Sequence, residues 1–224
     1  MRTVTGMVIG GTRSGKSEIA EGIFTDLVGG VASSAVYIAT GPPPTADDGW
    51  AERIAIHRER RPSSWSTVEV GSLGELSSLL VTQELPVIVD SLTILAARLD
   101  TLEAIDDFNP AGNPITLGTS HAERLTSNVD SLSHGGQETA GSAGEWPDAL
   151  RKLERSLATR KQAELVTMFV ADEVGLSVHP PTRVGIEFQD RAGILNSTVA
   201  ALCDNVWFVV AGRAMEMDRA GKFR

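Results

Sequence analysis

Short apolar runs alternate with segments in which apolar residues recur at helical spacing along most of the chain. Apolar runs bounded by turn-forming residues are typical of strands buried on both faces of a sheet, and they cover residues 5–9, 35–39, 67–70, 86–90, 165–170 and 206–210. The periodic segments predict helices over residues 17–27, 48–60, 72–81, 91–99, 148–164 and 182–203. This alternation predicts an α/β fold with a mostly parallel sheet between two helical layers, a three-layer αβα arrangement.

The pattern breaks between residue 104 and about residue 147. Gly, Ser, Asn, Asp and Pro dominate there, apolar residues become scarce, and no period persists. We interpret this segment as an insertion, either disordered or a functional lid, within one domain that spans residues 1–224. His121 and His134 lie inside it, and we expect both to be solvated loop residues and not ligands.

The composition excludes several classes of function. The formal net charge of −9 and the pI near 4.9 disfavour nucleic acid as a partner, because a polyanion is repelled. Cys203 is the only cysteine, so an internal disulfide is impossible, and we expect this side chain in the core. No run of about 18 apolar residues and no export signal occur. We therefore expect a soluble, cytoplasmic protein without a membrane span.

A glycine-rich loop between the first predicted strand and the first predicted helix carries the strongest chemical signal. It follows the P-loop pattern of glycine, four residues, glycine, lysine and serine. Glycines let successive backbone N–H groups converge on phosphate oxygens, and the helix start adds positive charge. Lys16 is expected to contact the β- and γ-phosphates, and Ser17 to bind Mg²⁺. The sequence thus predicts a P-loop NTPase-like fold in which GTP or ATP is bound by Gly10, Gly11, Thr12, Arg13, Ser14, Gly15, Lys16 and Ser17.

Asp90 ends the apolar run over residues 86–90 and is a second candidate for the metal and nucleotide site. In P-loop folds, an acidic residue at a strand end holds Mg²⁺ or its bound water. Aspartates in this position also commonly cap the next helix. The two roles can coexist, and the sequence leaves both open.

A histidine and several arginines lie together in the second predicted helix. His57 is flanked by Arg53, Arg58, Arg60 and Arg61. Guanidinium groups match phosphate oxygens in paired hydrogen bonds, and a neutral imidazole can attack phosphorus. Taken alone, these residues favour a solvated basic helix face. The predictions that Arg58 and Arg61 bind nucleotide and that His57 is catalytic therefore depend on further sequence motifs.

Further motifs follow the P-loop in a fixed order. They are Val-Tyr-Ile-Ala-Thr at 36–40, Arg-Ile-x-x-His at 53–57, Arg-Pro-x-x-Trp at 61–65, Glu-Val-Gly at 173–175 and Phe-x-Asp-x-x-Gly-x-x-Asn at 188–196. Together they resemble the bifunctional adenosylcobinamide kinase / adenosylcobinamide-phosphate guanylyltransferase family of cobalamin biosynthesis. The resemblance covers most of the chain outside the insertion.

The resemblance implies two successive reactions. In the first, GTP or ATP phosphorylates the corrinoid substrate adenosylcobinamide at the P-loop. In the second, His57 takes GMP from GTP and passes it to adenosylcobinamide phosphate, which gives adenosylcobinamide-GDP. The resemblance also implies a nucleotide or metal contact by Glu173, for which capping of the strand end is the alternative, and a homo-oligomer such as a trimer.

Some residues depart from the pattern usual in this family. Asp172 replaces Asn before Glu-Val-Gly, Gln189 replaces Arg, and Ser197 replaces Gln. Because they fall in the expected substrate or nucleotide region, two other functions stay open. One is a kinase whose histidine site has decayed. The other is a P-loop switch that binds a protein partner without transferring phosphate to a small molecule.

Overall fold

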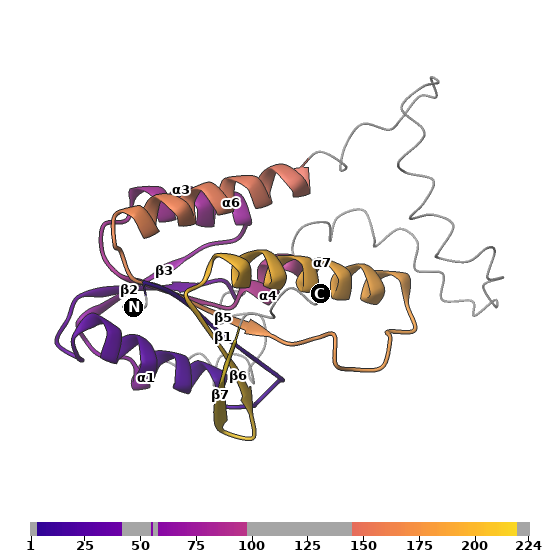
Figure 1. Ribbon diagram of the computed structural model, residues 1–224, viewed down its shortest axis with the longest axis horizontal. Helices are drawn as coiled ribbons and strands as arrows, with labels where there is room; N and C mark the ends of the chain where they lie inside the picture. Colours follow the sequence, from indigo (N-terminus) through magenta and orange to yellow (C-terminus); the bar gives the residue numbers. More distant parts are fainter. Residues whose placement is uncertain (1–3, 42–54, 56–57, 98–144, 219–224) are drawn as a thin grey trace.

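The computed structural model describes residues 4–41, 55, 58–97 and 145–218, whose strands form one seven-stranded sheet (Figure 1). The strands are β1 Thr5–Gly10, β2 Ala35–Ala39, β3 Trp65–Glu69, β4 Val87–Asp90, β5 Thr167–Asp172, β6 Asn205–Val210 and β7 Arg213–Met217. Their order in the sheet is β3-β2-β4-β5-β1-β6-β7. Neighbouring strands run parallel except β7, which is antiparallel to β6.

Helices cover both faces of this sheet. They are α1 Lys16–Val28, α3 Leu73–Thr82, α4 Leu92–Ala97, α6 Glu145–Gln162 and α7 Arg183–Leu202. Helix α1 packs on one face, whereas α3, α4, α6 and α7 pack on the other (Figure 1). These are the three layers of a P-loop NTPase-like αβα fold, so the predicted fold class is confirmed.

The central strands are buried on both faces because their side chains alternate between two apolar clusters. In β1, Met7 and Ile9 pack with α3, α4, α6 and α7, whereas Val8 packs with α1. This two-sided burial explains why the strands appear in the sequence as continuous apolar runs. Parallel pairing then brings the carboxyl ends of β1, β4 and β5 to one edge of the sheet, where ligands bind in open α/β folds.

Two conspicuous side chains pack in the core, which confirms the expectation for Cys203. Trp65 at the start of β3 lies edge to face with Phe24 of α1, with 5.1 Å between the ring centroids. Cys203 follows α7, and its side chain is only 1% exposed. Both side chains contribute apolar area to the two clusters, and neither lies at the carboxyl ends of β1, β4 and β5.

The structure corrects the sequence prediction at the end of the chain. The run over residues 206–210 is expected to be the last strand, but β7 follows it after a turn at Ala211 and Gly212, whose φ angles are 50° and 74°. Every residue of β7 is exposed, so this strand lacks the apolar run that marks the others.

Helix α6 begins earlier than predicted. It starts at Glu145, so residues 145–147 belong to the helix and not to the insertion predicted over 104–147. Pro147 stands in the first turn, where its missing N–H costs no helical hydrogen bond. The rest of the predicted insertion, with both its histidines, and most of the helix predicted over 48–60 lie outside the described residues.

Candidate active site

The predicted P-loop joins the buried end of β1 to the first turn of α1. Hydrogen bonds fix its backbone: the Ser14 N–H donates to the Gly11 carbonyl at 3.2 Å, and the Gly212 N–H donates to the Ser14 carbonyl at 2.9 Å. Gly15 is the N-cap of α1 and provides no capping side chain. No side chain at this position therefore competes with an anion for the N–H groups of the first turn.

Geometry requires glycine at two positions of the loop. A Cβ at Gly10 would lie 2.4 Å from the Val209 carbonyl oxygen, far inside van der Waals contact. Gly15 has a φ of 90°, in the left-handed region that L side chains rarely adopt. The curled backbone that a phosphate group needs is therefore built from these two glycines.

Lys16 is paired with a carboxylate from the neighbouring strand. Its Nζ lies 2.6 Å from Asp172 Oδ1 and 3.4 Å from the Gly11 carbonyl oxygen. The register of β1 and β5 sets Asp172 opposite Gly10, at the start of the loop. The sequence marks Asp172 only as a departure from the family pattern, yet it ends an apolar strand in a carboxylate, the same signal that singles out Asp90.

Asp90 lies at the end of β4 and is oriented by a tyrosine. The Tyr37 hydroxyl donates to Asp90 Oδ2 at 2.7 Å. Burial raises the pKa of Tyr37 well above its ordinary value, and the charge of Asp90 raises it further, so the phenol stays a hydrogen-bond donor at neutral pH. Tyr37 belongs to the apolar cluster on the α1 side. The Asp90 carboxylate therefore lies on the same side of the sheet as the helix that follows the P-loop.

The described part of the arginine-rich segment is anchored on this side as well. The Arg60 guanidinium donates to both carboxylate oxygens of Glu21 on α1, at 2.6 and 3.0 Å. Hydrogen bonding to Glu21 raises the pKa of Arg60. The guanidinium carbon of Arg61 lies 3.2 Å from the centroid of the Tyr37 ring. The segment thus reaches the tyrosine that bonds Asp90.

Two other predicted residues of this segment, His57 and Arg58, do not add to this description of the site. His57 lies outside the described residues. Arg58 is exposed, and its Nη2 lies 3.6 Å from Glu69 Oε1, which makes a loose surface ion pair. Of Arg58, Arg60 and Arg61, which the structure describes, Arg61 is the one that lies against the tyrosine bonded to Asp90.

Glu173 contacts the P-loop through its main chain. Its N–H donates to the Gly10 carbonyl at 3.0 Å. Its carboxylate oxygen Oε1 accepts from the Gly175 and Leu176 N–H groups, at 2.5 and 3.2 Å. The side chain therefore caps the turn that follows β5, which is the structural alternative raised from the sequence. Nucleotide or metal contact by Glu173 stays a prediction.

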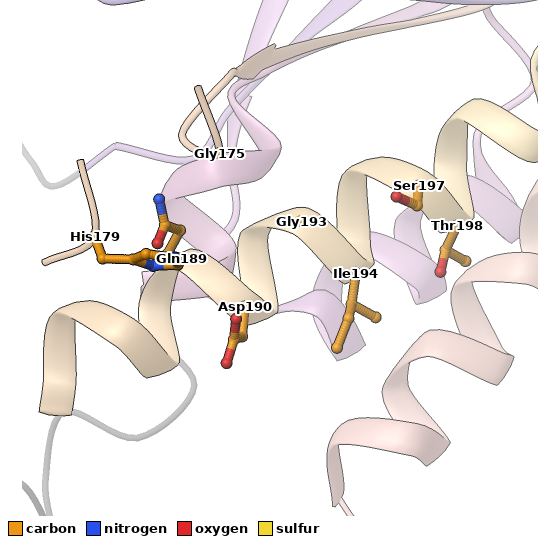
Figure 2. A pocket seen from close by; sticks show the side chains of 8 residues that line it. All are labelled: Gly175, His179, Gln189, Asp190, Gly193, Ile194, Ser197 and Thr198. Atoms are coloured by element: carbon orange, nitrogen blue, oxygen red, sulfur yellow. The ribbon is translucent and has the colours of Figure 1, made fainter. Parts of the chain in front are cut away.

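A cavity of about 540 Å³ lies between the segment that follows β5 and the outer side of α7 (Figure 2). The Gln189 amide donates to the Val174 carbonyl at 2.6 Å and ties α7 to this segment. The residues that line the cavity are Gly175, His179, Gln189, Asp190, Gly193, Ile194, Ser197 and Thr198. Two departures from the family pattern, Gln189 and Ser197, thus line one cavity, whereas the third, Asp172, contacts the P-loop lysine from the end of β5.

Curated relatives match nearly the whole chain. The bifunctional adenosylcobalamin biosynthesis protein CobU of Escherichia coli (strain K12) is 29% identical over 207 residues, which cover 92% of this chain and 95% of the relative. CobU of Salmonella typhimurium is 28% identical over 209 residues with the same coverage. The bifunctional adenosylcobalamin biosynthesis protein CobP of Pseudomonas aeruginosa is 30% identical over 213 residues, covering 94% of this chain and 95% of the relative.

The structural comparison is more distant. A KaiC-like protein from Pyrococcus horikoshii OT3 matches with a TM-score of 0.42 and 12% identity, and the match covers 92% of this chain and 70% of that one. By sequence, the family described as cobinamide kinase / cobinamide phosphate guanyltransferase matches residues 6–217, from β1 to the end of β7. The chain belongs to this cobinamide kinase / cobinamide phosphate guanyltransferase family, CobU.

Proposed function

We propose that the chain carries out both activities in the description of its family, one after the other. As a kinase, it transfers the γ-phosphoryl group of GTP or ATP to the aminopropanol hydroxyl of adenosylcobinamide. As a guanylyltransferase, it transfers GMP from a second GTP to adenosylcobinamide phosphate, which gives adenosylcobinamide-GDP and pyrophosphate. The observation that carries the proposal is the glycine loop between β1 and α1, with Lys16 inside it, in a chain of this family.

In the kinase step, the chain contributes position and charge. The acceptor hydroxyl oxygen bonds to the γ-phosphorus and gives up its proton to water, the bond to the β–γ bridging oxygen breaks, and the nucleoside diphosphate leaves with that electron pair. Backbone N–H groups of the P-loop and the Lys16 ammonium stabilise the negative charge on the phosphate oxygens. The N-terminus of α1 adds its partial positive charge at the same place.

The residues of the site fit a magnesium ion. Ser17 in the first turn of α1 and Asp90 at the end of β4 are the side chains that would hold it. Asp90 keeps one hydrogen bond from Tyr37, which orients its carboxylate. Within the described ranges, no group of three or more His, Cys, Asp or Glu side chains could hold a metal, and Mg²⁺ commonly uses only one or two carboxylates with phosphate oxygens and water. The ion would neutralise charge on the transferred phosphates.

For the second step, we propose His57 as the nucleophile. Its imidazole nitrogen bonds to the α-phosphorus of GTP, and the bond from that phosphorus to the pyrophosphate oxygen breaks. The phosphate of the corrinoid then attacks the same phosphorus and releases the imidazole. Support comes from the neighbouring residues, because Arg60 is bound to Glu21 and Arg61 lies over Tyr37, on the P-loop side of the sheet.

Labelling with α-labelled GTP tests the histidine step. The wild-type chain should acquire an acid-labile, base-stable label that the His57→Ala variant lacks, while its kinase turnover stays near the wild-type rate. A kinase without such a label in the wild type would be the single-activity enzyme, and would refute the guanylyltransferase half of the proposal.

The bifunctional transferase and the kinase-only enzyme both differ from a nucleotide switch in their response to the corrinoid. A transferase consumes GTP or ATP faster when adenosylcobinamide is added, whereas a switch hydrolyses nucleotide slowly and independently of it. If nucleotide consumption does not change when adenosylcobinamide is added, both enzyme proposals are wrong.

The assembly and the location of the enzyme complete the proposal. We propose a homo-oligomer such as a trimer, working in the cytoplasm, where GTP and ATP are made. Over the ranges that the structure describes, no helix combines the length and the apolar character needed to cross a bilayer. The choice between GTP and ATP as phosphoryl donor is tested by comparing kcat/KM for the two nucleotides.

A further inference from the structure

Asp172 touches the P-loop lysine, and the reactions proposed above leave it without a role. Its Oδ1 lies 2.6 Å from Lys16 Nζ, and the two side chains are only 26% and 11% exposed. An ion pair shielded from water in this way is stronger than one on the surface. The ammonium group that the phosphates require thus already has a close negative partner.

The main chain of Asp172 is fixed from several directions. Its N–H donates to Thr93 Oγ1 of α4 at 2.6 Å, and its carbonyl accepts from Asn196 Nδ2 of α7 at 3.0 Å. Within the sheet, β5 pairs with β1 as far as Asp172, which lies opposite Gly10. With this backbone fixed, the carboxylate can leave Lys16 only by rotation of its own side chain.

We propose that Asp172 is a positioning residue whose carboxylate serves as the internal counter-ion of Lys16. The incoming triphosphate must displace this carboxylate from Lys16. Asp172 thereby sets the affinity for nucleotide. The inference rests on the proposed nucleotide site at the P-loop. A carboxylate beside the loop repels phosphate, and an ammonium that it neutralises attracts phosphate less. In return, the pair keeps a largely buried ammonium from standing without a partner.

Replacement of the carboxylate by an amide isolates the charge, because Asp172→Asn keeps the size and shape of the side chain. We expect the Kd for magnesium–GTP and magnesium–ATP, measured by calorimetry on the full chain, to fall about tenfold, which corresponds to ~1.4 kcal/mol. The thermal midpoint without nucleotide should fall because the ion pair is lost. Tighter binding should at the same time enlarge the rise in midpoint on addition of nucleotide.

Asp204→Asn is the matched control. Asp204 Oδ1 lies 2.5 Å from Lys161 Nζ, in a similar ion pair just before β6, at the sheet edge opposite the P-loop. This variant should lose thermal stability with no change in the Kd for nucleotide. Asp172→Ser removes the same charge with a smaller side chain, and it takes the place of Asp172→Asn if that variant fails to fold.

The outcomes separate this inference from the proposed function. If the wild type binds nucleotide and both Asp172 variants bind it no more tightly, the counter-ion role is wrong and the nucleotide site stands. Weaker binding in the variants would instead make Asp172 a metal ligand or a direct phosphate-site residue, which also overturns the inference. If no folded protein, wild type included, binds GTP or ATP, the inference and the proposed function fall together.

Discussion

At the scale of single residues, one hydroxyl group determines how Asp90 can act. Tyr37→Phe removes the hydrogen bond of 2.7 Å to Asp90 Oδ2 and leaves the aromatic ring in place. A hydrogen bond to a charged group contributes about 1.5–3 kcal/mol, so the carboxylate should become less well oriented for a metal ion. We expect the Mg²⁺ concentration for half-maximal kinase activity to rise several-fold, as measured by magnesium titration at fixed nucleotide.

Ser64→Ala provides a control for the loss of a hydroxyl. Ser64 Oγ donates to the carbonyls of Val31 and Ser33, at 2.7 and 3.1 Å, away from Asp90. This change should lower stability without altering the magnesium requirement. If Tyr37→Phe leaves the magnesium requirement unchanged, the hydrogen bond from Tyr37 does not orient Asp90 for metal binding.

Asp204 makes a pH-dependent contribution to stability. Burial raises the pKa of this carboxyl, but hydrogen bonds from Lys161, Thr5 and Val4 outweigh burial, so the pKa lies below its ordinary value. A lowered pKa in the folded state stabilises the protein above the unfolded pKa of about 4, and this stabilisation is lost as the pH falls through the folded value.

The corresponding prediction concerns the acid side of the stability curve. Asp204→Asn should lower the free energy of unfolding at pH 7, and the difference from the wild type should shrink as the pH falls below about 4. Urea unfolding from pH 7 to pH 3 measures it. A difference that is independent of pH would mean that Asp204 acts only through packing.

At the scale of elements, one buried arginine joins α6 to the sheet and to the end of α3. Arg160 is 1% exposed, and burial lowers its pKa to about 10, so it remains charged at neutral pH. Its guanidinium donates to Thr167 Oγ1 and to the Leu85 carbonyl, both at 2.8 Å. It also donates to the carbonyls of Leu80, Gln83 and Val166.

Arg160→Leu should therefore destabilise the protein strongly. Each buried carbonyl left unpaired costs roughly 1–3 kcal/mol, so we expect a loss of about 3 kcal/mol or more. At about 2–4 °C per kcal/mol for a chain of this size, the thermal midpoint should fall by roughly 6–12 °C. Arg155→Leu on the exposed side of the same helix is the control and should change stability by less than about 0.5 kcal/mol. A similar midpoint for the two variants would contradict the structural role of Arg160.

The elements were predictable to the extent that each one carries its own signal. Strands buried on both faces show as apolar runs, and the P-loop shows as a spacing of glycines, lysine and serine. β7 was not predicted because an exposed edge strand does not need a run of apolar residues. Arg160 resembles any other charged residue of a helix in the sequence, because three of its partners, Leu80, Gln83 and Leu85, lie at or after the end of α3, far away along the chain.

The order of strands explains what the sequence left open at the site. Asp90, Asp172 and Lys16 lie far apart in the sequence, and the order β4-β5-β1 sets β5 directly beside the P-loop strand. Only with this order known does Asp172, and not Asp90, emerge as the carboxylate in contact with Lys16. Local patterns predicted Lys16 and Asp90 as candidate site residues, but pairing between strands decided which carboxylate meets the lysine.

At the scale of the whole molecule, apolar side chains gather on the surface around the cavity of α7. Leu176 and Val178 in the segment after β5 are 80% and 92% exposed, and Val184 and Ile194 of α7 are exposed as well. Exposed apolar clusters commonly mark contacts between proteins. Since we propose a homo-oligomer, we expect a second copy of the chain to cover this surface.

The double variant Leu176→Asp/Val178→Asp tests this contact. Burying two new carboxylates in an apolar interface is costly, so sedimentation velocity at micromolar concentration should show an oligomer for the wild type and a monomer for the variant. The P-loop is formed within one chain, so the Kd for nucleotide should stay within about threefold of the wild-type value, less than the tenfold that 1.4 kcal/mol represents. Val31→Asp, at an exposed apolar position just beyond α1, should leave the oligomer intact. A wild-type monomer, or a double variant that sediments like the wild type, would place the contact between copies elsewhere.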